Sequence, residues 1–159
     1  MKTITKRREL YISRYYSVSR QMVYRAWTDP KHLARWWGPK DFTCPVCEIE
    51  ARAGGRLRIV MHGPDGTEYP MRGTVTEART AERFAFDYEA LDAAGKPVLS
   101  GRLSVSFADE DNKTRMSLSV YAEGLGPDAP EKLEGMETGW NQSLDRLARS
   151  LHSLTQEKP

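Results

Sequence analysis

Two tryptophan-bearing parts of the chain decide the fold. The first runs from Ala26-Trp27-Thr28-Asp29-Pro30 to Trp36-Trp37-Gly38-Pro39, and the second is Gly139-Trp140-Asn141-Gln142-Ser143-Leu144-Asp145-Arg146-Leu147. All four tryptophans lie in these parts, and the segment between them reads as strands and turns. Aromatic residues on both flanks of a sheet are typical of a cup-shaped domain closed by a helix. The pattern therefore predicts a binding cavity and does not indicate a reaction.

Apolar and polar residues alternate from Cys47 to Tyr121. The alternation is interrupted by short turn signals, among them Gly54-Gly55 and Pro64-Asp65-Gly66. Period-two alternation with short polar turns predicts an antiparallel meander with one wet and one dry face. Six such strands, together with the extended segment Leu10–Val18, make a sheet of about seven strands.

A long amphipathic helix is predicted at the C-terminal end, because leucines, Met136 and Trp140 recur at three- and four-residue steps from Leu133 to Leu154. Two short helices are expected after the first strand, the second capped by Asp29 with proline in its first turn. The helix has one apolar stripe and the sheet one apolar face, so each covers the other. The predicted fold class is α+β: a bent antiparallel sheet of about seven strands wrapped around the long helix. Gly135 and Gly139, which are costly inside a helix, make room for a ligand or a strand, or mark a kink.

Length and charge limit the classes of protein. The 159 residues predict a single domain over 1–159, with residues 1–8 as a flexible basic tail. The net charge of +2 does not favour nucleic acid as a partner. We find no signal peptide and no apolar run long enough for membrane insertion, which predicts a cytoplasmic protein. The sequence leaves the oligomeric state open, a homodimer included.

Cys44 and Cys47 form the chain's only C-x-x-C pair. Redox chemistry of the thioredoxin type needs the first thiol at a helix N-terminus, whereas a strand is predicted to follow here. A structural zinc site needs four ligands, and only three histidines accompany the two cysteines. Two ordinary thiols are the favoured interpretation, and we expect no metal site and no cofactor.

Several motifs together resemble the START-like, or helix-grip, superfamily, the fold of the birch pollen allergen and of polyketide cyclases. The chain is more narrowly similar to bacterial proteins of the family named for the activator of heat-shock-chaperone ATPase. The residues that carry this resemblance are Ala26–Pro30, Trp36–Pro39, Pro45–Cys47, Gly54-Gly55, Met61 with Gly63–Gly66, and Gly139–Leu144. The resemblance implies an internal cavity for apolar ligands between the sheet and the long helix. The family name implies chaperone regulation, which in the eukaryotic proteins depends on an additional domain that nothing before Leu10 can supply.

A small-molecule binding protein with an apolar cavity for a hydrophobic or lipid-like ligand is therefore the favoured function. The alternatives are a chaperone-associated interaction module and a cyclase-like enzyme that works by shaping its cavity. We predict no catalytic residue, because the dry face carries only tyrosines and Cys47 as ionisable groups. The expected ligand-binding residues share the dry face, the helix stripe or the paired tryptophans: Trp36, Trp37, Phe42, Met61, Tyr69, Met71, Phe84, Phe86, Met136, Trp140 and Leu144. For the tryptophans and methionines the competing interpretation is ordinary core packing.

Overall fold

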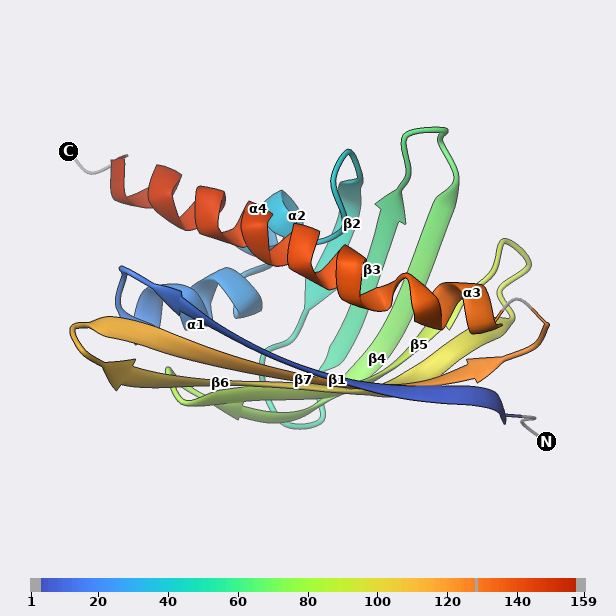
Figure 1. Cartoon of the computed structure of the whole chain (residues 1–159), viewed down its shortest axis with the longest axis horizontal. Helices are drawn as coiled ribbons and strands as arrows, with labels where there is room; N and C mark the ends of the chain where they lie inside the picture. The colour runs from blue at the N-terminus through green and yellow to red at the C-terminus, as the bar shows by residue number, and fades with distance from the viewer. Residues whose placement is uncertain (1–3, 128, 157–159) are drawn as a thin grey trace.

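The computed structural model describes residues 4–127 and 129–156. The strands are β1 (Ile4–Tyr16), β2 (Thr43–Ile49), β3 (Arg56–His62), β4 (Glu68–Arg79), β5 (Arg83–Leu91), β6 (Pro97–Glu110) and β7 (Lys113–Leu125), and the helices are α1 (Arg20–Thr28), α2 (Pro30–Trp36), α3 (Ala129–Glu134) and α4 (Met136–Gln156). All strand pairs are antiparallel and form one sheet in the order β1-β7-β6-β5-β4-β3-β2. The helix α4 crosses the inner face of this sheet (Figure 1). The predicted helix-grip architecture is confirmed.

The strand register aligns the apolar positions into rows across the sheet. One row joins Val75, Phe86, Leu103, Val120 and Leu10, each the direct cross-strand partner of the next. All five side chains are buried. Cross-strand apolar pairs of this kind stabilise a sheet and specify its register, because a shift by one residue would turn the row to solvent. The dry face predicted from the alternation is therefore the floor of the core.

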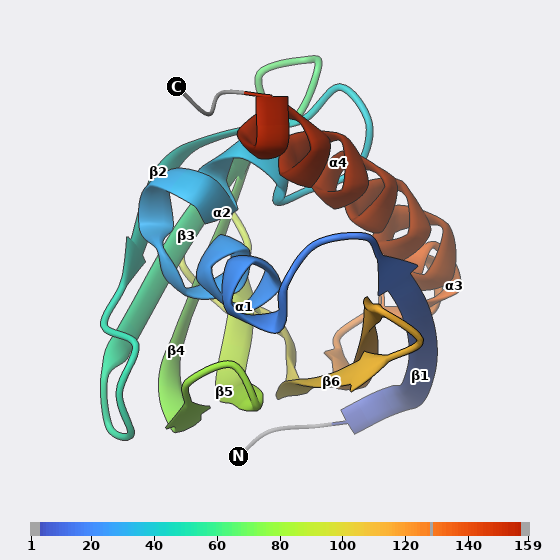
Figure 2. The same ribbon diagram turned by 90° about the vertical axis from the view of Figure 1, so that its left-hand side faces the viewer.

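The sheet bends into a trough, with α1 inside it and α4 across its open side (Figure 2). Gly73 and Gly101 flank Tyr88 on neighbouring strands. A Cβ on Gly73 would overlap the Asp87 carbonyl oxygen, and one on Gly101 would overlap that of Tyr121. Only glycine permits such close backbone approach inside a strand, so the bend depends on these two positions.

Local capping determines where the two short helices begin. The Ser19 hydroxyl accepts a hydrogen bond from the Met22 amide (3.2 Å) at the start of α1, and the Asp29 carboxylate accepts one from the Lys31 amide (2.9 Å) at the start of α2. Pro30 occupies the first turn of α2, as predicted. The chain leaves α2 through Gly38, whose φ of 111° favours glycine.

The C-terminal helix differs from the prediction of one continuous element, because it is broken at Gly135 into α3 and α4. The Arg8 guanidinium donates hydrogen bonds to the carbonyl oxygens of Leu133 (2.6 Å) and Glu134 (3.2 Å) at this break. A continuous helix would engage those oxygens with amides four residues further on. Arg8 therefore supplies hydrogen bonds to carbonyl oxygens that the break leaves without amide partners. Gly135, a poor helix former, lowers the cost of interrupting the helix.

The basic tail predicted over residues 1–8 is also corrected, since β1 begins at Ile4 and pairs with β7 from Leu125 onward. Residues 1–3 lie outside the described part of the chain. The apolar–polar alternation is interrupted in this part of β1, because the inward-facing residue 8 is a charged arginine. Its guanidinium binds the carbonyl oxygens at the α3–α4 break. Further along β1, Arg14 forms an ion pair with Asp145 of α4 (2.8 Å). Two arginines therefore connect the edge strand β1 to the helix. Within the described residues, no helix is both long and apolar enough to cross a membrane.

Candidate functional site

An apolar cavity of about 440 Å³ lies between the sheet and the C-terminal helices. The inner faces of β3 to β7 line it on one side, α3 and the first half of α4 on the other, and the segment from Trp37 to Phe42 at one end. Its volume falls in the range of small-molecule sites, about 300–1,000 Å³. The cavity is therefore large enough for a small organic ligand.

The hollow exists because α4 carries small residues where it crosses this part of the sheet. Gly139 and Ser143 are four residues apart on one face of α4, Gly135 stands at the break just before the helix, and all three line the cavity. Further along the same helix, Leu144, Leu147 and Leu151 are buried in the core. The same helix therefore leaves space over one end of the sheet and fills the other.

Tryptophans form the wall between the cavity and the packed core. Trp37 and Trp140 line the cavity and meet edge to face, with ring centroids 5.3 Å apart. Trp27 lies behind them, 6.4 Å from Trp37 and 6.2 Å from Trp140, and Trp36 packs against Trp27 at 4.7 Å. Offset and edge-to-face contacts at these distances are favourable and rigid. A ligand in the cavity would contact two indole rings of a connected cluster.

Two hydroxyl groups of the cavity lining, those of Tyr88 and Ser143, already have hydrogen-bond partners. The Tyr88 hydroxyl donates to the Tyr121 carbonyl oxygen (3.2 Å), and the Ser143 hydroxyl donates to that of Gly139 (3.0 Å). Burial raises the pKa of Tyr88 above the ordinary tyrosine value, so its phenol stays neutral at physiological pH. The charged residues of the lining are Glu131 and Lys132, and both are exposed on α3. The interior is therefore neutral, and charge is confined to its rim.

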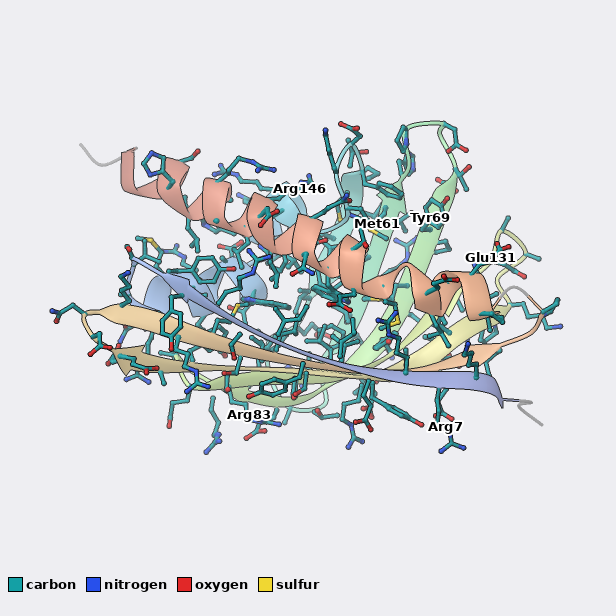
Figure 3. All side chains as sticks on the ribbon, in the orientation of Figure 1. Arg7, Met61, Tyr69, Arg83, Glu131 and Arg146 are labelled. Carbon is teal, nitrogen blue, oxygen red and sulfur yellow. The ribbon has the colours of Figure 1, made fainter. Side chains whose placement is uncertain are left out.

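The mouth of the cavity is built by β3, β4 and the segment after α2. Met61 and Tyr69 are cross-strand partners and lie side by side where α4 crosses β3 and β4, with Glu131 toward the α3 end (Figure 3). Phe42 packs on Tyr69 at a centroid distance of 5.5 Å, and Tyr69 is 37% exposed. A Cβ on Gly38 would lie 2.9 Å from the flexible Met61 side chain, and the φ of 111° favours glycine at this lining position whatever the space.

Arg146 of α4 holds that segment against the helix. Its guanidinium donates hydrogen bonds to the carbonyl oxygens of Gly38 (2.8 Å), Pro39 (3.1 Å), Arg35 (3.2 Å) and Trp37 (3.4 Å). Cations beside the last carbonyls of a helix also interact favourably with its dipole. The position of Trp37 and Gly38 therefore depends on a residue more than one hundred positions away.

The structure separates the predicted binding residues into two groups. Eight of them line the cavity: Trp37, Phe42, Met61, Tyr69, Met71, Phe86, Met136 and Trp140. Trp36, Phe84 and Leu144 do not line it and are fully buried in the adjoining core. They share the predicted faces with the lining residues but occupy other places along the trough.

Part of the lining was not predicted. The β5–β6 hairpin contributes Ala90, Leu91, Val98 and Leu99, and α3 contributes Glu131 and Lys132. Ala90 and Leu99 continue the alternation of their strands, so extending the strands toward the turn would have found them. Leu91 and Val98 are out of phase with it, and the ladder is irregular between Ala90 and Leu91. Glu131 and Lys132 at the rim could not be predicted in this way, because the sequence does not distinguish exposed helix residues beside the cavity from exposed helix residues elsewhere.

Other candidate chemistry lies outside the cavity. Cys44 and Cys47 are both free, Cys44 buried and Cys47 half-buried. His62 is on the outer side of the sheet, where its ring nitrogen lies 3.1 Å from a Glu68 carboxylate oxygen. Among residues 4–127 and 129–156, no group of three or more histidine, cysteine, aspartate or glutamate side chains is placed to hold a metal ion.

A bent antiparallel sheet that grips a C-terminal helix over an apolar hollow defines a START-like domain. Within this class the chain belongs to the family described as "Activator of Hsp90 ATPase homolog 1-like protein", whose profile matches residues 17–152. No curated protein matches the chain.

Solved structures of bacterial proteins share the fold. A protein of Chromobacterium violaceum is 30% identical with a TM-score of 0.76, and the match covers 90% of this chain and 96% of that one. A family member from Silicibacter pomeroyi is 24% identical with a TM-score of 0.76, covering 91% and 98%. A protein of Nitrosomonas europaea is 22% identical with a TM-score of 0.75, covering 93% and 96%. These likenesses cover nearly the full length of each chain.

Proposed function

We propose that this protein binds a small hydrophobic ligand of lipid-like chemistry in the cavity under α4. The observation that carries the proposal is an apolar interior of about 440 Å³ in which the Tyr88 and Ser143 hydroxyl groups are already hydrogen-bonded and the charged groups stay at the rim. A polar ligand would leave its own groups unpaired in such a site, whereas an apolar one loses nothing.

The lining also supports tolerance of ligand shape. Met61, Met71 and Met136 contribute flexible, polarisable side chains from two strands and from α4. Methionine adapts to irregular surfaces and is common where a site accepts varied apolar partners. Glu131 and Lys132 at the rim give a polar head group access to charge and water, which suits an amphipathic molecule with its tail inside.

The expected affinity is modest. Burying about 200 Å² of apolar ligand surface contributes roughly 5 kcal/mol at 25 cal/mol per Å². The loss of translational and rotational freedom offsets much of this gain, which leaves a dissociation constant in the range of roughly micromolar to millimolar. Binding rather than catalysis is proposed, because the ionisable groups that line the interior are the tyrosines 69 and 88, and proton transfer at physiological pH needs groups with pKa values near that pH.

The test is to fill the cavity and measure the uptake of a fluorescent fatty-acid analogue. Met71→Trp should weaken binding at least about tenfold while the protein stays folded, because a bulkier side chain occupies the ligand's space. The matched control is Thr74→Trp on the same strand, since Thr74 is exposed and does not line the cavity.

Native mass spectrometry after gentle purification, followed by organic extraction, would identify any small molecule that travels with the wild-type protein. Equal binding by the wild type and Met71→Trp, with both folded, would place the ligand elsewhere. A wild type that takes up none of a series of fatty acids, alcohols and sterols would reject the proposed function.

A further inference from the structure

The strand β2 contains a β-bulge at the C-x-x-C pair. Thr43 pairs with His62 and Val46 with Val60, so three steps on β2 oppose two steps on β3. Residues three apart on a regular strand point to opposite faces. The extra residue of the bulge cancels this, and both Cys44 and Cys47 lie on the inner side, among the residues of the core. Pro45 fits the bulge because it has no amide hydrogen to donate to a ladder.

The two sulfurs interact, and their surroundings differ. The pKa of the Cys44 thiol is lowered, chiefly because the Cys47 thiol hydrogen-bonds to its sulfur, with Arg146 adding a favourable positive charge. The pKa of Cys47 is raised, chiefly by the same hydrogen bond and then by burial. Arg146 is fixed near this point by its hydrogen bonds to the segment after α2. Cys44 is therefore suited to act as the nucleophile, whereas Cys47 keeps its proton and is suited to react second.

Access to the pair favours a small reagent. Cys44 is 9% exposed, and its thiol donates a hydrogen bond to the Val46 carbonyl oxygen (3.4 Å). Cys47 is half-buried and borders a surface hollow next to Pro30 and Ile49. A bulky disulfide substrate would reach the buried sulfur poorly, whereas a peroxide is little larger than water. The geometry therefore suits oxidation by a small peroxide.

We propose that Cys44 and Cys47 are a peroxide-sensitive dithiol in which Cys44 is oxidised first and Cys47 resolves it to an intramolecular disulfide. The Cys44 thiolate attacks one oxygen of hydrogen peroxide, the O–O bond breaks, and hydroxide leaves to become water with a proton from solvent. The Cys47 sulfur then attacks the sulfur of the resulting sulfenic acid, and the S–O bond breaks as its proton leaves with the hydroxyl as water. Two thiols are oxidised and one peroxide is reduced to two waters.

A disulfide between them requires the two Cα atoms to lie within about 7 Å, so the bulge must keep or adopt that spacing. The position allows it, since β2 is an edge strand whose ladder is formed with β3 alone. The alternative use of the pair as a metal site lacks a third ligand within the described residues. This proposal is independent of the proposed ligand, and it can hold if the cavity binds nothing.

The experiment exposes the reduced full chain to hydrogen peroxide and follows intact mass and free-thiol content under denaturing conditions. The wild type should lose two hydrogen atoms and both thiols while remaining the same oligomer on a non-reducing gel. The Cys47→Ala variant should stop at a sulfenic acid that dimedone traps.

A wild type that keeps both thiols, or that links only between molecules, would overturn the proposal. The order of reaction is tested by competitive alkylation of the reduced wild type, because each single variant removes the hydrogen bond between the two thiols. Peptide mapping should then find Cys44 modified before Cys47, with a rate that rises through a pKa below that of an ordinary thiol. Modification of Cys47 first would reject the assignment.

Discussion

Replacing Gly139 with alanine should stabilise the protein and weaken ligand uptake at the same time. Glycine inside a helix costs about 0.8–1.0 kcal/mol relative to alanine. A Cβ at Gly139 would lie 3.6 Å from Cγ of Pro39, an ordinary van der Waals contact, so no clash offsets this gain. We expect the free energy of unfolding to rise by about 1 kcal/mol, or the melting temperature by roughly 2–4 °C for a chain of this length.

Urea unfolding and thermal melts measure this change, and Ala148→Gly on the exposed side of the same helix is the matched control. That variant should lose about the same free energy, because it tests helix propensity without touching the cavity. The methyl group of Gly139→Ala projects into the cavity lining, so binding of the fatty-acid analogue should fall a few-fold despite the added stability. If Gly139→Ala is less stable than the wild type while Ala148→Gly loses only the expected free energy, α4 packs on Pro39 without spare room. That result would refute the account of why the hollow exists.

Two further predictions concern the core and the buried phenol. Leu144→Asp should destabilise the domain by on the order of 5 kcal/mol or more in urea unfolding, because it puts a charge at a fully buried position. Ala148→Asp on the exposed face of the same helix should change stability little. Equal unfolding midpoints of the two variants would show that Leu144 does not pack in the core. The raised pKa of Tyr88 predicts that stability is retained below the ordinary tyrosine pKa of about 10 and falls as pH rises above it, because the unfolded chain ionises first. Tyr88→Phe should weaken that alkaline fall and lose about 1 kcal/mol at neutral pH with the hydrogen bond to Tyr121, and an unchanged pH profile would contradict this reasoning.

Local patterns were sufficient for the elements of secondary structure. Alternation with period two predicts strands because successive side chains point to opposite faces, and the observed register from Val75 to Leu10 follows it. Asp29 and Pro30 predicted the start of α2 because capping involves only neighbouring residues. The same reasoning failed at Arg8, whose partners at the α3–α4 break lie 125 and more residues away.

The residues of the cavity were predicted in part, since a periodic pattern identifies a face but not a position along it. Phe84 and Phe86 share one face of β5, yet Phe86 lines the cavity and Phe84 is packed in the core. The difference depends on what packs against each side chain: Tyr24 of α1 meets the Phe84 ring edge to face at 6.5 Å, whereas Phe86 borders the open space under α4.

What the sequence by itself determined is therefore the α+β class, the strand order implied by a meander, and the apolar face that each element buries, because these follow from short-range periodicity. The tertiary structure alone decided where the trough stays hollow, how the tryptophans join into one wall, and that the bulge at Pro45 brings Cys44 and Cys47 to the same side. Each of these depends on contacts between residues far apart in the chain, and the packing of many side chains at once sets such contacts in a way that no local pattern records.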